Sequence, residues 1–421
     1  MKINIRHIEV LAVIATACVV TACSDKASPE TPGTNMTEYE IIEPALTNPK
    51  AHFTDTEMSA LGQNGVAFRL YEAALSGDVT ENAANGNFNI SPASAVVGLT
   101  LVANSIDEPA RSEIATELGY EGIDMLNNTT GKLLSYLPAD GLGVVIKMAN
   151  SIWVNSEYTC SGDFVNAMRR TFYSPVTSLN MIDEINALRI INSWCETSTE
   201  GMIKSVLENI NPGCVAIWAN ALYFNGTWKD KFDKSLTSES TFHGRDGESM
   251  VAMMHANRPC FYSASGRMEM VSIDFDGMNY CLDIISDEKG ELTKESYSEL
   301  LSKAKTFHVD LGLPRFEVNT SVDLTAIFRN LPSIFSKGTF ATMGLPMMAP
   351  VTASKSIQKT AIKVNEDGAE AAAVTITDLD TSIFGPDEYG IVKVTFDSPF
   401  TYIIREKRNG IILFIGRVEN L

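Results

Sequence analysis

The chain has 421 residues, enough for two or three ordinary domains or for one large α/β or α+β body. Its 33 Lys and Arg against 52 Asp and Glu give a formal net charge of −19, so we expect it not to bind nucleic acid, which would repel it. Apolar residues make up 45% of the chain and charged residues 20%, which is normal for a soluble globular protein with a large core.

The first residues have the features of an export signal. Lys2 and Arg6 supply positive charge, and residues 10–22 form an apolar run that is short for a membrane span. The run ends in Val20-Thr-Ala-Cys23, which resembles the bacterial lipobox, where the cysteine is lipidated and becomes the new N-terminus. We expect a lipoprotein signal peptide at 1–22 and lipidation of Cys23. An ordinary cleaved signal peptide is the alternative.

Residues 23–50 are predicted to form a lipidated tether, because they place four prolines among small and acidic residues and cannot bury a core. The residue after the cysteine is Ser24 and not an aspartate, which fits sorting of the lipoprotein to the outer membrane. We therefore expect a protein that is lipid-anchored to the bacterial envelope, at the outer membrane or the cell surface.

In the remaining chain, helices are predicted early and strands late. Apolar residues at helical spacing predict a helix over 65–75, with Asn64 as its N-cap. The predicted strands cover 144–154, 215–224, 391–396 and 411–415. Asn409-Gly410 is predicted to form a turn between strand segments. This order favours an α+β fold over alternating βαβ units.

Little in the sequence supports catalysis or metal binding. No histidine lies in H-E-x-x-H, no serine lies in G-x-S-x-G, and no Gly-rich loop offers a phosphate cradle. The match of Ser286 and Lys289 to S-x-x-K falls in a charged turn with no shelter for a nucleophile. The five cysteines after Cys23 suit neither a disulfide framework nor a zinc motif, so we expect buried free thiols. We expect no enzyme, no cofactor and no metal.

Five segments, taken in chain order, resemble motifs of the serpin family. They are Asn87-Phe-Asn-Ile-Ser-Pro-Ala-Ser94, Ile191-Asn-Ser-Trp194 with Thr199 and Gly201-Met-Ile203, Ala219-Asn-Ala-Leu-Tyr-Phe-Asn-Gly-Thr-Trp228, Leu313-Pro-Arg-Phe316 and Leu413-Phe-Ile-Gly-Arg-Val418. Each is weak alone, but five in the family's order are specific. The resemblance extends from about residue 60 to the C-terminus.

The resemblance implies an α+β serpin fold over 51–421. This fold has a large central β-sheet A, sheets B and C, about nine helices and an exposed reactive-centre loop at about 366–391. It also implies a polar cluster that controls the opening of sheet A, which maps to Ser91, Ser94, Asn192 and Gln358. Gln358 stands where the family usually has a histidine, and it cannot titrate near neutral pH.

Glu366-Asp-Gly-Ala-Glu-Ala-Ala-Ala-Val-Thr375 resembles the serpin hinge, with hinge residues Glu366, Gly368, Ala369, Glu370, Ala371, Ala372 and Ala373. A capping-box-like start and a run of alanines would also suit a helix, but the β-branched residues that follow favour a strand. Alternate positions from Ala369 to Thr381 carry no charge, whereas the acidic residues fall on the other parity. This pattern is typical of a strand with one buried face.

The resemblance implies a suicide inhibitor. A protease cleaves the loop and forms an acyl-enzyme, and the cut loop then enters sheet A as an added strand. Gly368 would supply dihedral freedom at the hinge. Expected partners are serine-type proteases, with cysteine proteases as a second class. We expect a monomer.

Two counts place the scissile bond. Fourteen residues beyond the hinge glycine lies Ser382-Ile383, whereas the spacing back from Phe396 gives Phe384-Gly385. Ser382 suits an elastase-like pocket and Phe384 a chymotrypsin-like one, and a subtilisin-like target also fits. No Lys or Arg lies between Lys363 and Lys393, which excludes a trypsin-like target. A non-inhibitory, serpin-fold surface binding protein is the alternative function.

Overall fold

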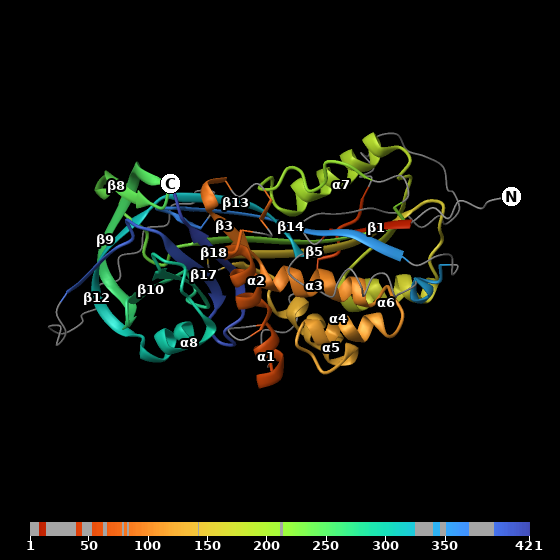
Figure 1. Cartoon of the computed structure of the whole chain (residues 1–421), viewed down its shortest axis with the longest axis horizontal. Coiled ribbons are helices and arrows are strands. Elements are labelled where there is room, and N and C mark those ends of the chain that lie inside the picture. Colours follow the sequence, from red (N-terminus) through yellow and green to blue (C-terminus); the bar gives the residue numbers. More distant parts are fainter. Residues whose placement is uncertain are drawn as a thin grey trace.

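A computed structural model describes residues 8–13, 39–43, 53–61, 65–77, 80–81, 84–141, 143–210, 214–324, 340–345, 351–369 and 391–421. The architecture is α+β, as predicted (Figure 1). The helices are α1 (Asp55–Leu61), α2 (Val66–Leu75), α3 (Pro92–Ala103), α4 (Ala110–Glu117), α5 (Ile123–Tyr136), α6 (Gly162–Phe172), α7 (Glu184–Ser198) and α8 (Lys294–Lys303). These are eight α-helices in the described residues, where about nine were expected in the whole chain.

The strands of the first half of the chain are β1 (Ile8–Val13), β2 (Thr80–Glu81), β3 (Phe88–Ile90), β4 (Ala139–Gly141), β5 (Val144–Asn155), β6 (Val176–Leu179) and β7 (Ala216–Thr227). Those of the second half are β8 (Ser238–Gly244), β9 (Gly247–Ser265), β10 (Met268–Asp274), β11 (Tyr280–Ser286), β12 (Lys305–Pro314), β13 (Phe316–Asp323), β14 (Val351–Asn365), β15 (Gly368–Ala369), β16 (Val392–Thr395), β17 (Phe400–Glu406) and β18 (Ile412–Val418). Three short 3₁₀ turns join some of these elements, at Ala84–Gly86, Lys234–Leu236 and Ala341–Met343.

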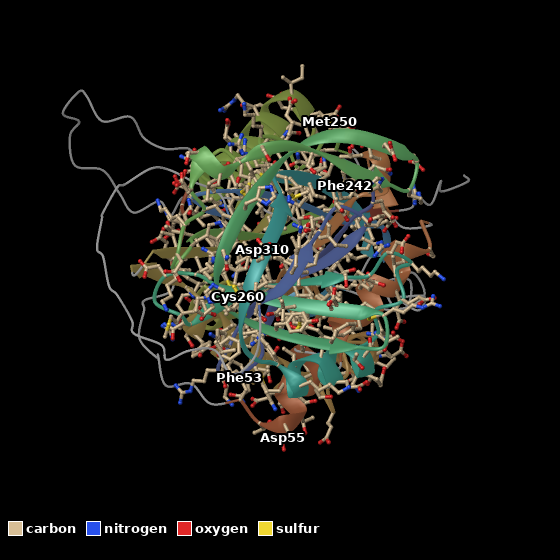
Figure 2. All side chains as sticks on the ribbon, turned by 90° about the vertical axis from the view of Figure 1, so that its left-hand side faces the viewer. Phe53, Asp55, Phe242, Met250, Cys260 and Asp310 are labelled. Carbon is tan, nitrogen blue, oxygen red and sulfur yellow. The ribbon has the colours of Figure 1, made fainter. Side chains whose placement is uncertain are left out.

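The strands form two large sheets. The first, here called sheet A, has the order β2-β13-β14-β1-β7-β5-β4, with β6 on β5 and with β15 against both β14 and β7. The second has the order β16-β12-β9-β10-β11-β17-β18-β3, with β8 on β9. The long β9 pairs with β8 and β12 and then with β10, so the expected sheets B and C are joined in one ladder. Figure 2, which views the molecule from the left-hand side of Figure 1, shows β9 and β12 side by side.

The helices cover sheet A on both faces. In Figure 1, α7 lies along one face and α3, α4, α5 and α6 lie on the other. Every residue of α3 is buried, which is typical of a helix in the centre of a large core. Ser91 caps this helix by accepting a hydrogen bond from the backbone N–H of Ser94, and Pro92 occupies its first turn.

Most of the strongly patterned elements were predicted correctly. The predicted strands 144–154 and 215–224 are β5 and β7, and the two predicted near the C-terminus are β16 and β18. Gly410 has a φ of 69° in the turn before β18, a conformation that favours glycine. The predicted helix 65–75 is α2, but its N-cap is Gly65 and not Asn64, which lies outside the described residues.

Candidate functional site

Sheet A has a gap between β7 and β14. On the side away from the gap, β7 pairs with β5 and β14 pairs with β13. On their facing sides, only the ends of these strands have a described partner, through β1 and β15. Within the described chain, residues 219–225 of β7 and 358–363 of β14 therefore face each other with no strand between them. Two strands that are neighbours in a sheet but are not paired with each other can accept a strand between them.

The side chains that border this gap leave little empty space between the two strands. A cavity of about 10 Å³, room for roughly one water molecule, lies at this place. Leu222 and Phe224 of β7, Thr360 and Ala361 of β14, and Ser91 and Ser94 at the start of α3 are among its lining residues. A strand that enters here must displace side chains that now line this cavity.

One end of the gap already holds the start of the predicted hinge. In β15, Gly368 pairs with Asn365 of β14 and Thr227 of β7, and Ala369 pairs with Val364 and Gly226. Both pairings are antiparallel, and Ala369 is 2% exposed. Gly368 and Ala369 are therefore extended, as predicted, and they do not form the alternative helix that would begin at Asp367.

The role predicted for Gly368 needs a correction. A side chain at Gly368 would collide with the carbonyl oxygen of Gly226 and would stand 2.9 Å from the Gly226 carbonyl carbon. Glycine is needed here because the backbone of β7 passes so close. The dihedral freedom of glycine is not the reason, because a φ of 159° is near extended backbone.

The other end of the gap holds β1. Ile8–Val13 runs parallel to both neighbours and pairs with residues 351–357 of β14 and with Ile217 and Trp218 of β7. These residues belong to the segment 1–22, which is predicted to be a cleaved signal peptide. If that peptide is removed, this end of the gap loses its strand.

Glu366 anchors the hinge to the body. Its carboxylate accepts hydrogen bonds from Arg315, with Nη2 at 2.6 Å and Nε at 2.9 and 3.0 Å, and from the Thr237 hydroxyl at 2.6 Å. Glu366 is only 2% exposed. Burial alone would raise the pKa of this carboxyl, but the hydrogen bonds from Arg315 and Thr237 outweigh it and hold the pKa below its usual range.

The next residue adds a second anchor. Asp367 accepts hydrogen bonds from Lys234 at 2.6 Å and Lys231 at 3.1 Å, and the Lys234 contact is the main reason that the pKa of Asp367 is lowered. Trp228 fixes the backbone of the turn, because its N–H donates to the carbonyl of Asp367 and its indole donates to the carbonyl of Asn365. The turn between β14 and β15 is thus held by both charge and backbone contacts.

The predicted sheet-opening cluster is assembled in part. The Gln358 amide clasps the backbone of Ser91: its Oε1 accepts from the Ser91 N–H at 2.9 Å and its Nε2 donates to the Ser91 carbonyl at 2.8 Å. Ser94 lies one turn along α3, within hydrogen-bonding distance of Ser91 Oγ. Gln358 therefore connects β14 directly to the start of α3, as a neutral amide that pairs with both backbone groups.

Asn192 lies elsewhere. It is on α7, where its amide donates to the carbonyl of Leu207 and accepts from the N–H groups of Val206 and Leu207. The asparagine that reaches Ser94 is Asn220 of β7, whose Oδ1 accepts from the Ser94 hydroxyl. The prediction that Asn192 belongs to the sheet-opening cluster is therefore wrong, and Asn220 is the asparagine of this cluster. A polar residue at the centre of the apolar run 215–224 was the signal that sequence reasoning missed, because a buried amide needs a partner.

Asn220 extends the cluster through sheet A. Its Nδ2 donates to Asn150 Oδ1 of β5 at 2.7 Å, and Asn150 donates to the carbonyl of Phe172, the last residue of α6, at 2.8 Å. Both asparagines are buried. A chain of amides thus joins α3, β7, β5 and α6 next to the gap.

Several predicted site residues lie outside the described residues. They are Glu370, Ala371, Ala372, Ala373, the residues of both candidate scissile bonds (Ser382, Ile383, Phe384 and Gly385) and the predicted lipidation site Cys23. Their roles stay predictions.

The cysteine thiols are largely buried, and the Ser286 hydroxyl is hydrogen-bonded to the backbone. All five cysteines after Cys23 carry free thiols, and Cys195, Cys214, Cys260 and Cys281 are buried as predicted, whereas Cys160 is only half-buried. The Ser286 hydroxyl bonds to the backbone of Glu269 on the neighbouring strand. Among the described residues, no three His, Cys, Asp or Glu side chains are placed to hold a metal ion, and no helix is long and apolar enough to cross a membrane.

Comparisons with known proteins agree with this architecture. Residues 62–421 match the family model "Serpin (serine protease inhibitor)". Serpin-ZX of Arabidopsis thaliana is 26% identical over 86% of this chain and 98% of its own, and the horse leukocyte elastase inhibitor is 24% identical over 81% and 95%. The structure of human thyroxine-binding globulin superposes with a TM-score of 0.75 at 20% identity, over 87% of this chain and 98% of its own.

The family model covers most of the chain, and the fold agrees with solved serpin structures. Members of this family are in general protease inhibitors and not catalysts. The chain belongs to the serpin family.

Proposed function

We propose that this protein is an inhibitory serpin that traps serine-type proteases of elastase-, chymotrypsin- or subtilisin-like specificity as covalent acyl complexes. The observation that carries the proposal is that Gly368 and Ala369, the start of the hinge, pair with both β7 and β14 at one end of the gap, while no described strand lies between these two strands farther along. β15 runs antiparallel to both β14 and β7, so a strand that continued from Ala369 in the same direction would extend along the gap.

The chemistry is a single transfer followed by a conformational change. The protease serine hydroxyl attacks the carbonyl carbon of the scissile residue, the peptide bond breaks, and the proton goes to the leaving amine. An ester then joins the protease to the new C-terminus. Insertion of the loop as a strand pairs the two open edges of the gap and buries one parity of its side chains, and this movement carries the attached protease away from the loop's original position.

The target class rests on the loop sequence. Ser382 suits an elastase-like pocket and Phe384 a chymotrypsin-like one. The similarity to the leukocyte elastase inhibitor supports the first of these. Trypsin-like proteases are not proposed, because the loop has no Lys or Arg between Lys363 and Lys393.

The test is to incubate the protein with an elastase-like, a chymotrypsin-like and a subtilisin-like protease and with trypsin as the control. We expect a complex that survives denaturant with at least one of the first three and none with trypsin. Loop cleavage by all three without a complex would instead support a non-inhibitory binding protein, a role for which the fold similarity to thyroxine-binding globulin offers a precedent.

We propose further that Cys23 is lipidated and anchors the serpin body to the bacterial envelope. The lipobox-like Val20-Thr-Ala-Cys23 after the apolar run 10–22 supports this. Lipid labelling of the wild type, with loss of the label in Cys23→Ala, is the expected result. An unlabelled mature chain would show an ordinary signal peptide instead.

A further inference from the structure

Part of the predicted tether is docked on the serpin body. Glu40 accepts two hydrogen bonds from the guanidinium of Arg169, from Nη1 at 2.6 Å and from Nη2. The Tyr39 hydroxyl lies 2.9 Å from the hydroxyl of Thr197. Two-point pairing of a carboxylate with arginine fixes orientation as well as distance, so these contacts hold the segment in one position.

Apolar contacts accompany the polar ones. Tyr39 and Ile41 pack against the apolar cluster beneath α7, which includes Trp194 of α7, Trp153 of β5 and Ile217 of β7. Tyr39, Glu40, Ile41 and Ile42 are all partly buried. Residues 39–43 therefore behave as part of the folded body, although the composition of residues 23–50 as a whole predicts a tether.

The partners of this segment lie on opposite faces of sheet A. Arg169 is on α6 and Thr197 is at the end of α7, and Figure 1 shows these helices on the two sides of the sheet. Further along, Lys147 of β5 bonds to Glu200 in the turn after α7, and this bond, with a smaller contribution from Glu43, raises the pKa of Lys147. The segment thus connects α6, α7 and the β5 side of sheet A.

This connection matters because of what α7 rests on. Trp194 and Ile191 of α7 pack on β5 and β7, the strands on one side of the gap. Thr199, Met202 and Ile203, which follow the end of α7, line the cavity between β7 and β14. A strand that enters there must pass these residues, so α7 must adjust its position on the sheet. Packed interfaces resist such sliding, and a segment that ties α7 to α6 adds to that resistance.

We propose that Tyr39–Glu43 is an intramolecular clip that docks between α6 and α7 and slows the entry of a strand into sheet A. Its docking surface on the body consists of Arg169, Thr197 and the edge of the apolar cluster beneath α7. The effect on protease trapping rests on the proposed function, whereas the docking and its effect on strand entry do not.

Docking is tested with charge reversal. Glu40→Arg and Arg169→Glu each break the ion pair, and the double variant restores it with the charges exchanged. Arg170→Glu is the matched control, because Arg170 is the exposed neighbour of Arg169 on the same helix. Hydrogen exchange of the peptide that contains residues 39–43 should become faster in both single variants. It should return toward the wild-type rate in the double variant and stay unchanged in the control.

Strand entry is measured with a synthetic peptide of residues 369–381, added to the intact protein and followed by native electrophoresis. Each single variant should accept the peptide about two- to fivefold faster, the range expected for one partly exposed ion pair, and the double variant should do so near the wild-type rate. Ile41→Ser, which weakens the apolar contact without touching the ion pair, should also accelerate entry.

Three results would overturn the clip. Unchanged exchange of residues 39–43 in both single variants would show that the segment is not docked by this pair. Faster exchange with an unchanged rate of peptide entry would show docking without restraint. An equal effect of Arg170→Glu would show a general charge effect. Because none of these readouts uses a protease, failure of the inhibitory function would be seen separately, as intact clip behaviour without a covalent complex.

Discussion

At the scale of single residues, ion pairs hold Glu366 and Asp367 at the start of the hinge. Glu366 is held by Arg315 and Thr237, and Asp367 by Lys231 and Lys234. Immediately after these anchors, Gly368 and Ala369 lie between two strands; the Gly226 carbonyl leaves no room for a side chain at Gly368, and Ala369 is almost fully buried. The hinge therefore combines a firmly held turn with a first pair of residues already in the sheet.

Ala369→Arg should abolish covalent trapping while loop cleavage continues. Ala369 is 2% exposed and paired on both sides, so an arginine there must either displace its neighbours or bring a charge into the sheet. The loop would then insert too slowly to hold the acyl-enzyme. Ala369→Ser, which stays small, is the control and should still trap. Denaturing electrophoresis separates the outcomes, and a normal complex with the arginine variant would contradict the insertion model.

Glu366→Gln should lower the free energy of unfolding by about 1–3 kcal/mol at neutral pH, because it weakens hydrogen bonds to a charged group. The pKa of Glu366 is lowered in the folded protein, so its contribution is complete above the unfolded-state pKa and is lost as the pH falls through the folded-state pKa. The difference between wild type and variant should therefore shrink in acid. Urea unfolding at several pH values measures it, and a difference that grows toward low pH would refute the assignment.

These residue contacts were mostly beyond sequence reasoning. The hinge itself was recognised from its resemblance to a family motif, but nothing local predicts that Glu366 meets Arg315, which is 51 positions away in the chain. The pairing of Asp367 with two lysines more than 130 positions earlier is equally non-local. Such contacts depend on strand register across sheet A, which sequence patterns alone do not specify.

At the scale of elements, the buried amides couple α3 to sheet A. Ser94 of α3 bonds to Asn220 of β7, and Gln358 of β14 clasps the backbone of Ser91. β7 and β14 are the strands on the two sides of the gap, and each is bonded to the same helix N-terminus. We infer that this helix start is the point at which opening of the gap is resisted.

A double-mutant cycle tests this coupling. Ser94→Ala and Asn220→Ala should show an interaction free energy of about 0.5–3 kcal/mol, as expected for residues in one network. Ser94→Ala combined with Asn192→Ala should be additive, because Asn192 bonds to the loop after α7 instead. Chemical unfolding of the six proteins gives both cycles. Coupling of Ser94 with Asn192 rather than Asn220 would restore the sequence-based assignment and contradict the geometry.

Strands with strong local sequence patterns could be predicted, whereas the joining of the two sheets and the docking of residues 39–43 could not. β5 and β7 were found because long apolar runs have few other solutions in a folded protein. The joining of sheets B and C through β9 was missed, because one long strand with mixed burial has no clear pattern. The docking of residues 39–43 was missed because their neighbours' proline-rich composition dominated the interpretation.

At the scale of the whole molecule, the protein is a sheet with an incomplete centre. In the part of the chain that the structure describes, β7 and β14 are not paired with each other, and β15 at the start of the hinge marks the place where a strand would continue between them. A fold that gains backbone pairing when its own loop is cut can use that free energy to do mechanical work on a bound protease.

Cleavage of the loop alone should therefore make the protein more stable. A protease that cuts the loop without being trapped should raise the thermal midpoint by roughly 5 °C or more, since about 5 kcal/mol of added pairing is divided by an unfolding entropy of about 0.9 kcal/mol/K for a chain of this size. Calorimetry of the intact and cut proteins measures the change. Ala369→Arg, cut in the same way, should show a smaller rise, and equal midpoints for the cut and intact wild type would mean that the loop stays outside the sheet.

The intact mass of a denatured mixture with an elastase-like or chymotrypsin-like protease tests the central claim most directly. The account predicts one species whose mass is the sum of both proteins minus a C-terminal peptide. That peptide has 421 − 382 = 39 residues for cleavage after Ser382, or 421 − 384 = 37 for cleavage after Phe384. Only cleaved protein beside free, active protease, for every such protease tried, would contradict it.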